Sequence, residues 1–159
     1  PALKKLVHNF KYRFVRDISP LLAKLICKAL IRNDIPLPDF LLPVPLHPRR
    51  LRWRGFNQSL LLAAHISKEL APLMEMEILD ILERKKYNRP QAEIKNRHER
   101  LRNVQNIFAI RSGTDPFAIK DKAILLIDDI ATTGATLDEC AKTLKQAGAK
   151  KVFAAVVAM

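Results

Sequence analysis

Residues 124–136 read Ile124-Leu125-Leu126-Ile127-Asp128-Asp129-Ile130-Ala131-Thr132-Thr133-Gly134-Ala135-Thr136, and this stretch decides the fold. Four consecutive apolar residues predict a central strand that is buried on both faces. Two aspartates follow at its carboxyl end, where open α/β sheets bind their ligands. The turn that comes next opens a helix, whose amides and hydroxyls can bind a phosphate that the glycine lets approach closely. The stretch therefore predicts a sugar-phosphate site, with a phosphate at the turn and hydroxyls or a metal at the acids.

The segments on either side of this stretch indicate an α/β domain. Residues 136–147 form an amphipathic pattern that Gly148 should end, and 152–158 read as a strand, so the three segments make a βαβ unit. Further helices are expected at 3–16, 20–31 and 57–70, strands at 40–46 and 106–110, and another apolar stretch at 78–82. We therefore predict a single α/β domain over residues 1–159, with a mostly parallel sheet flanked by helices and a helical lead-in over 1–33.

Local signals refine three of these elements. Ser19 followed by Pro20 is typical of a helix start, with Ser19 as the N-cap. Prolines remove amide donors around the strand at 40–46, so we expect it to be short and to end in an unusual loop. The inner side of the helix at 57–70 is expected to carry Leu60, Leu61, Ala64 and Leu70.

The composition limits the class of protein. Of 159 residues, 28 are Lys or Arg and 16 are Asp or Glu, which gives a formal charge of +12, and 48% are hydrophobic. This apolar fraction argues against disorder, and no apolar run approaches the roughly 18 residues of a membrane-spanning helix. Cys27 and Cys140 are too few for a disulfide framework or a four-cysteine metal site, and we interpret both as packing residues. With no apolar signal peptide, we expect a cytoplasmic protein whose charge indicates a polyanionic partner, either nucleic acid or a phosphorylated small molecule.

Two segments concentrate the positive charge. The first carries Arg49, Arg50, Arg52 and Arg54 beside Trp53, with no acid among them. Arginine forks bind phosphates with two hydrogen bonds, so this cluster could serve a pyrophosphate, a nucleic acid backbone, or both. Trp53 is either an aromatic that stacks on a nucleobase or a half-buried packing residue. The second segment, 83–102, holds eight Lys or Arg against three Glu and few large apolar groups, which predicts an exposed arm.

The stretch at 124–136 resembles the phosphoribosyl pyrophosphate (PRPP) binding motif of type I phosphoribosyltransferases. That motif has four apolar residues, two acids, two further positions and then a small-residue phosphate loop. The resemblance implies that Asp128 and Asp129 hold the ribose hydroxyls and that the loop binds the 5′-phosphate. It also implies Mg²⁺, carried by PRPP near the two acids and not held by the protein directly. The implied PRPP-binding residues are Asp128, Asp129, Ala131, Thr132, Thr133, Gly134, Ala135 and Thr136.

More of the chain resembles one branch of these proteins, the ComF/GntX family associated with natural competence and DNA uptake. The matching residues are Phe10-Lys11-Tyr12-Arg13, 43–52, Arg54-Gly55-Phe56-Asn57-Gln58, Arg84, Pro90-Gln91, Glu99-Arg100, Asn103 and Phe108. This resemblance implies a pyrophosphate loop with Leu46, His47 and Arg49, and a hood over about 83–105 with Arg84 and Gln91. The residues expected to bind nucleic acid are Arg49, Arg50, Arg52, Arg54, Lys85, Lys86 and Arg89.

The chain departs from that family in two places. ComF proteins carry a four-cysteine zinc module before the Phe-Lys-Tyr helix, whereas this sequence starts at Pro1. We expect the module, and any Zn²⁺, to lie upstream of the chain. The family's threonine three positions before the hood glutamine is Asn88 here, so a role taken from that position is in doubt.

Two functions fit these observations. The first is a ComF-like protein of DNA uptake that binds PRPP with Mg²⁺ and engages single-stranded DNA through its positive charge. Helicase or channel proteins of the uptake apparatus are its implied partners. The second is an active phosphoribosyltransferase, which transfers phosphoribose from PRPP to a nitrogenous base that no residue identifies. We favour the first, because a small anionic substrate does not need basic residues spread over two segments.

Overall fold

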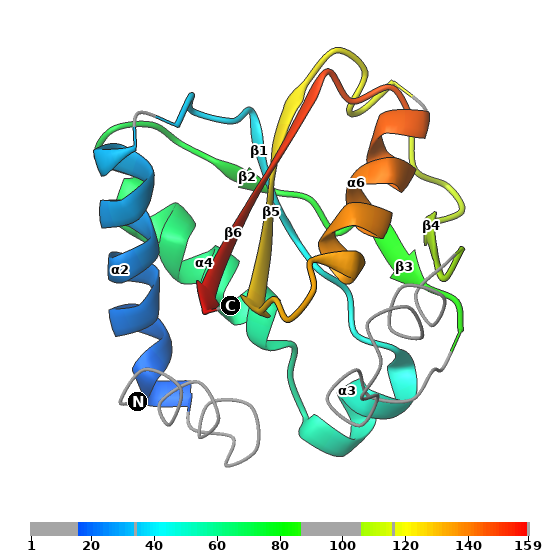
Figure 1. Cartoon of the computed structure of the whole chain (residues 1–159), viewed down its shortest axis with the longest axis horizontal. Helices are drawn as coiled ribbons and strands as arrows, with labels where there is room; N and C mark the ends of the chain where they lie inside the picture. The colour runs from blue at the N-terminus through cyan, green and yellow to red at the C-terminus, as the bar shows by residue number, and fades with distance from the viewer. Residues whose placement is uncertain (1–15, 34, 87–105, 116, 159) are drawn as a thin grey trace.

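A parallel sheet forms the centre of the computed structural model, which describes residues 16–33, 35–86, 106–115 and 117–158 (Figure 1). Its strands follow the order β2-β1-β5-β6, and every neighbouring pair is parallel. The four strands are β1 (Phe40–Pro43), β2 (Glu77–Ile78), β5 (Ala123–Ile130) and β6 (Lys151–Ala158). A smaller antiparallel sheet pairs β3 (Leu82–Arg84) with β4 (Phe108–Ile110). The predicted α/β class with a mostly parallel sheet is therefore confirmed.

Helices cover both faces of the parallel sheet. The helical elements are η1 (Arg16–Ile18), α2 (Ser19–Arg32), α3 (Pro48–Arg54), α4 (Gln58–Leu70) and α6 (Ala135–Gln146). One core cluster joins α2 and α4 to the sheet, and a second joins α6, β3 and β4 to its other side (Figure 1). No helix in the described ranges is long and apolar enough to span a membrane.

Strand β5 is the centre of both core clusters. Its residues Ile124, Leu125, Leu126 and Ile127 are each 0% exposed. Since successive side chains of a strand point to opposite faces, Leu125 and Ile127 pack with α2 and α4, while Ile124 and Leu126 pack with α6. The four-residue apolar run is thus explained by burial on both sides, as predicted.

The βαβ unit after β5 is also confirmed. Helix α6 leads directly into β6, which pairs with β5 in parallel from Ala123 and Lys151 onward. Gly148 follows the helix with a φ of 100°, a backbone conformation that favours glycine. Its carbonyl accepts a hydrogen bond from the amide of Asp121 (3.0 Å), which ties the end of the helix to the start of β5.

Strand β1 ends early, as its prolines predict. The pairing with β5 runs only to Pro43, four residues in, and Val44 adds one more hydrogen bond by donating to the Ile127 carbonyl (2.9 Å). Pro43 and Pro45 cannot donate, so regular pairing stops there. The chain leaves the sheet at the carboxyl end of β5.

Two expectations about helices are wrong in detail. Ser19 is not the N-cap of α2: the cap is Ile18, because η1 already brings the backbone into helical geometry before Ser19. The inner face of α4 is also rotated from the expected one. Leu60 is 42% exposed and Ala64 is exposed, because three consecutive leucines allowed two registers and the sheet selects the other. The buried apolar face of α4 consists of Leu62, Ala63, Ile66 and Leu70.

Both cysteines are packing residues, as predicted. Cys27 and Cys140 are free and buried, in different core clusters. Burial raises the pKa of Cys27 to about 11 and that of Cys140 well above its ordinary value. Both thiols are therefore protonated and unreactive at neutral pH. The predicted helix at 3–16 and most of the predicted arm lie outside the described residues.

The rotated face of α4 makes a direct test possible. Leu62→Ala removes a side chain that is 0% exposed between α4 and the sheet, and we expect it to lower the free energy of unfolding by about 2–5 kcal/mol. Leu60→Ala is the matched control and should change it by about 0.5 kcal/mol or less. Urea unfolding followed by circular dichroism measures both. Equal losses in the two variants would contradict this helix orientation.

Candidate functional site

Asp128 lies at the carboxyl end of β5 with its carboxylate held by two donors. The Ser59 hydroxyl donates to Oδ1 (3.0 Å), and the backbone amide of Asp129 donates to the same atom (2.9 Å). Both donors are fixed by backbone or by packing, since Ser59 is buried at the start of α4. The orientation of Asp128 is therefore set before any ligand arrives.

Ser59 owes its place to the cap of α4. The Asn57 side-chain oxygen accepts from the Ser59 amide (3.0 Å), and its side-chain nitrogen donates to the Val44 carbonyl (3.1 Å). This double contact ties the first turn of α4 to the end of β1, beside Asp128. Ser59 is not among the predicted site residues. Asn57 is a recognisable N-cap, but the contact with Asp128 spans 69 positions and has no local signal.

Asp129 has a different environment from Asp128. It is 5% exposed, and its Oδ1 accepts from the backbone amide of Ile130 (2.8 Å). Successive residues of a strand face opposite sides, so the two carboxylates do not point together. A small hollow at the strand end is lined by Asp128 and not by Asp129.

The turn after β5 forms the rest of that hollow. Its lining residues are Asp128, Ile130, Ala131, Thr132, Gly134, Thr136 and Leu137. Gly134 has a φ of 78° and is the N-cap of α6, so the turn brings backbone amides to the hollow at a helix N-terminus. Thr133 and Ala135 do not line it: the Thr133 hydroxyl instead accepts from the Ala135 amide (3.4 Å). The donors present suit a phosphate, and the Asp128 carboxylate suits ribose hydroxyls.

Of the residues expected in a pyrophosphate loop, Leu46 and His47 precede a short helix that was not predicted, and Arg49 lies in its first turn. After Leu46, helix α3 begins with His47 as its N-cap, whose Nδ1 accepts from the Arg49 amide (3.2 Å). Pro48 occupies the first turn and Gly55 ends the helix in the left-handed region, with a φ of 77°. A proline at the start and a glycine after the end are helix signals that the sequence contained. These signals did not lead to the prediction of a helix, because the segment consists mainly of arginines and lacks an apolar face.

Arg84 lies at the end of β3, near both Arg50 of α3 and Asp128. It is half-buried on β3, with its guanidinium 5.7 Å from the centre of the Phe108 ring. Burial and the charge of Arg50 lower the pKa of Arg84 to about 10, while Asp128 acts in the opposite direction. Arg84 therefore lies near both Arg50 and Asp128, and the two arginines create a positive region on this side of the strand end.

The same positive region acts on His47. Partial burial and the surrounding arginines, Arg84 first, lower its pKa from the ordinary 6.5. A neutral imidazole is what its capping role needs, because Nδ1 must keep a lone pair to accept from the Arg49 amide. Burial, Arg84 and the arginines of α3 thus favour the neutral imidazole that caps α3.

Several predicted site residues lie apart from Asp128, Arg50 and Arg84, or fall outside the described ranges. Lys85 and Lys86 are exposed after β3, and Lys85 lies 4.0 Å from Glu83. Arg89 and Gln91 fall outside the described residues. In the part of the chain that the structure describes, no three carboxylate, imidazole or thiol groups gather to hold a metal ion.

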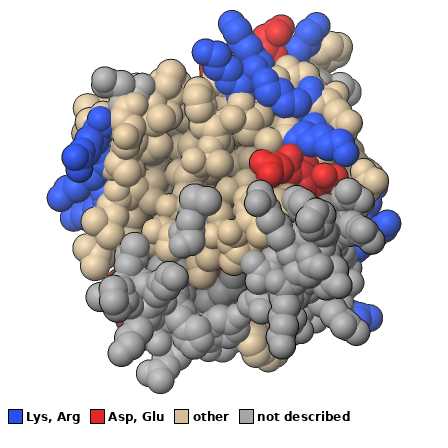
Figure 2. All heavy atoms as spheres, in the orientation of Figure 1, with Lys and Arg blue, Asp and Glu red and all other residues tan. Residues whose placement is uncertain are grey.

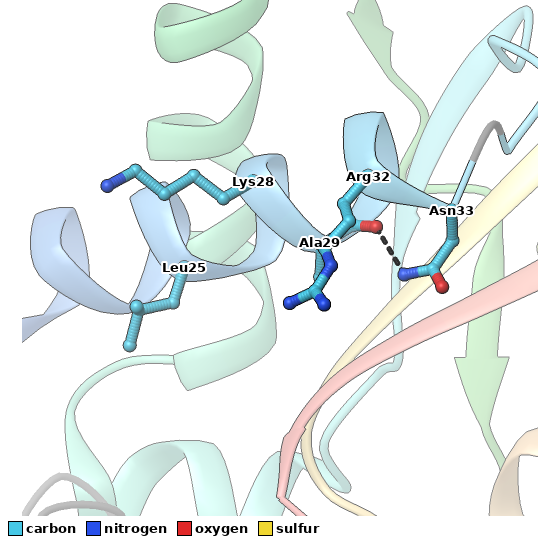
Figure 3. A pocket seen from close by; sticks show the side chains of 5 residues that line it. All are labelled: Leu25, Lys28, Ala29, Arg32 and Asn33. Atoms are coloured by element: carbon cyan, nitrogen blue, oxygen red, sulfur yellow. Dashed lines mark hydrogen bonds between the residues drawn. The ribbon is translucent and has the colours of Figure 1, made fainter.

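A second hollow lies far from these residues, on the outer side of α2 (Figure 3). Its lining residues are Leu25, Lys28, Ala29, Arg32 and Asn33. The Asn33 side chain donates to the Ala29 carbonyl (2.7 Å) and ends the helix. This end of α2 leads toward the start of β1, at the opposite end of the sheet from Asp128 (Figure 1). It contains none of the predicted site residues.

Comparison with known proteins agrees with the geometry of the strand end. A family model described as a phosphoribosyl transferase domain matches residues 57–159. The fold resembles the glutamine PRPP amidotransferase of B. subtilis with a TM-score of 0.56 and 15% identity, covering 90% of this chain and 26% of that one. The chain belongs to the phosphoribosyl transferase domain family.

Sequence relatives place it more narrowly, in the ComF family that its motifs resemble. It is 30% identical to Competence protein F of Haemophilus influenzae over 155 residues, 94% of this chain and 65% of the relative. It is 30% identical to DNA utilization protein YhgH of Escherichia coli K12, over 96% of this chain and 65% of the relative. Competence protein ComFC of Streptococcus pneumoniae is 43% identical over 69% of this chain and 43% of its own length. The chain thus spans about two thirds or less of these relatives.

The left-handed turn at Gly134 can be tested by substitution. An added Cβ would lie 3.8 Å from Asp138 Oδ2, an ordinary contact, so space is not the obstacle. Gly134→Ala should nevertheless lower the free energy of unfolding by about 1–2 kcal/mol, because a φ of 78° is costly for alanine. Gly134→Asn is the control and should cost less, since asparagine tolerates this region. Thermal or urea unfolding measures both, and an unchanged alanine variant would contradict the turn geometry.

Proposed function

We propose that this chain is the phosphoribosyltransferase-like part of a ComF-type protein for DNA uptake, and that it binds PRPP with Mg²⁺ and single-stranded DNA in the cytoplasm. The observation that carries the proposal is the meeting of three groups at one end of the sheet. These are the held carboxylate of Asp128, the amide-rich turn at Gly134, and the positive region of Arg50 and Arg84. A ligand with hydroxyls between a phosphate and a pyrophosphate needs those three kinds of group in one place.

Each group has a part in PRPP binding. The amides around Gly134 and the hydroxyls of Thr132 and Thr136 receive the 5′-phosphate at the start of α6. Asp128 accepts hydrogen bonds from the ribose hydroxyls while Ser59 keeps its carboxylate in position. Arg50 and Arg84 neutralise charge on the pyrophosphate side. Mg²⁺, brought by PRPP itself, supplies further charge neutralisation at the pyrophosphate.

The role in DNA uptake rests on the relatives' names. They are named as competence or DNA utilization proteins, and this chain spans 65% of the length of Competence protein F. Two further features agree with a role at nucleic acid. The formal charge is +12, and α3 carries four arginines with no acid in the helix. Contacts with helicase or channel proteins stay predictions.

An active transferase is the second candidate, and the charge around Asp128 favours it. Transfer would form a bond between an acceptor nitrogen and the anomeric carbon while the bond to pyrophosphate breaks. Arg50 and Arg84 lie where they could stabilise the negative charge of the departing pyrophosphate. Release of pyrophosphate on addition of candidate bases or DNA separates this candidate from a protein that only binds PRPP.

The PRPP proposal is tested by calorimetric titration with and without Mg²⁺. Wild type should bind in a magnesium-dependent manner. Asp128→Asn should lose at least about tenfold in affinity, because it removes a charged acceptor that Ser59 orients. Leu60→Ala, exposed on the outer side of the first turn of α4, is the folded control and should bind like wild type. Unchanged affinity in folded Asp128→Asn would contradict the assigned ribose site.

The nucleic-acid proposal is tested by salt dependence. Arg49→Ala with Arg52→Ala should weaken binding to single-stranded DNA and reduce the slope of log K against log salt by about 1.4, at roughly 0.7 per phosphate. Lys24→Ala with Lys28→Ala on α2 removes the same charge elsewhere and should leave the slope near that of wild type. Both lysines and both arginines are exposed, so folding should not differ. Equal slopes for the two double variants would show that α3 makes no specific contact with DNA.

A further inference from the structure

Trp53 is largely exposed to solvent, although tryptophan is among the largest apolar side chains. It is 66% exposed, and no residue of α3 is buried. The interpretation of Trp53 as a half-buried packing residue is therefore wrong. An indole exposed to this degree contributes little to the core, so its presence on this helix calls for another explanation.

Helix α3 presents two different faces. At 100° per residue, Arg50 and Arg54 share one side, and both are half-buried. The Arg54 guanidinium donates to the Gln58 side chain (3.2 Å). The charge of Arg50 lowers the pKa of Arg84, which lies near Asp128, so this side of α3 faces the proposed PRPP site. Arg49, Arg52 and Trp53 lie within about 100° of one another on the adjoining surface, and all three are exposed.

The exposed side has the composition of a base-stacking surface. Arg49 precedes Arg52 by three positions and Trp53 by four, so Arg49 is the neighbour of both on the helix surface. An aromatic ring offers a face to any nucleobase, and adjacent guanidiniums bind the phosphates on either side of that base. The caps at His47 and Gly55 fix the helix that holds these side chains in register.

We propose that the exposed face of α3, which carries Arg52, Arg49 and Trp53 in that order around the helix, is a stacking site for an unpaired base of single-stranded nucleic acid. The proposal rests on the nucleic-acid part of the proposed function, not on PRPP binding. It assigns the two sides of α3 to two ligands, PRPP on the Arg50 and Arg54 side and the strand on the Trp53 side. A single-stranded ligand is required, because the bases of a duplex are already stacked on each other.

The chain contains one tryptophan, so its fluorescence reports on this site alone. We would titrate the full chain with an oligothymidylate of about 12 nucleotides, a length within the range that small single-strand sites cover. Stacking should quench the Trp53 emission. An abasic oligonucleotide with the same number of phosphates should bind more weakly and quench little, since it offers charge without a base. A duplex of equal length should also quench little.

Variants separate stacking from charge. Trp53→Ala should lose between about 5-fold and 150-fold in affinity for the oligothymidylate, with no change in the salt slope, because no charge is removed. Trp53→Phe should recover part of the loss. Phe117→Ala is the matched control: Phe117 is 70% exposed and has the Lys120 ammonium over its ring, but it lies outside α3. This variant should bind like wild type.

Three results would overturn the proposal: equal affinity of wild type and Trp53→Ala, equal quenching by the normal and abasic strands, or equal quenching by single strand and duplex. The first would indicate that the exposed face of α3 contacts a protein instead. PRPP titration of Trp53→Ala distinguishes the two proposals, since Trp53 is 66% exposed whereas Arg50 is half-buried. Loss of PRPP binding together with DNA binding would contradict the division of α3 into two faces.

Discussion

The burial of β5 on both faces constrains everything else in this molecule. Four consecutive side chains with no exposure leave a ligand no access to the strand except at its ends. At the carboxyl end, the chain turns immediately into α6, and β1 has already left the sheet because of its prolines. The opening that results is bordered by Asp128 and by helix N-terminal amides. The chemistry of the site thus follows from the packing of the core.

The second constraint is electrostatic. Helix α3 lacks a buried residue and consists mainly of like charges, so burial does not explain its stability. Its ends do: His47 accepts from the first turn and Gly55 adopts the left-handed conformation that closes the last. The lowered pKa of His47 belongs to the same arrangement, because burial first and the nearby arginines second disfavour the protonated imidazole, which could not cap the helix. Local backbone geometry therefore maintains a concentration of charge next to the ligand site.

The sequence predicted the parts of the fold that depend on local patterns of residues. The apolar run of β5, the amphipathic α6 with Gly148, and the proline-limited β1 all follow from residues within a few positions of each other. Features that depend on contacts between distant segments were not predictable. The hydrogen bond from Ser59 to Asp128 needs α4 and β5 to meet, and the choice of Leu62 over Leu60 for the core needs the sheet. Helix α3 was missed for another reason, because its caps were visible while its lack of an apolar face argued for a loop.

Strand β6 gives the molecule an open side. In the described part of the chain, β6 pairs with β5 alone, and residues 152–158 contain neither a charge nor a proline. Figure 2 shows an uncharged surface in the middle of the face that carries β6, with Lys and Arg above it and to either side. Such an edge is a template on which another extended chain can form backbone hydrogen bonds. Within the described ranges, this edge can therefore associate with other extended chains during synthesis and refolding unless it is covered or kept apart.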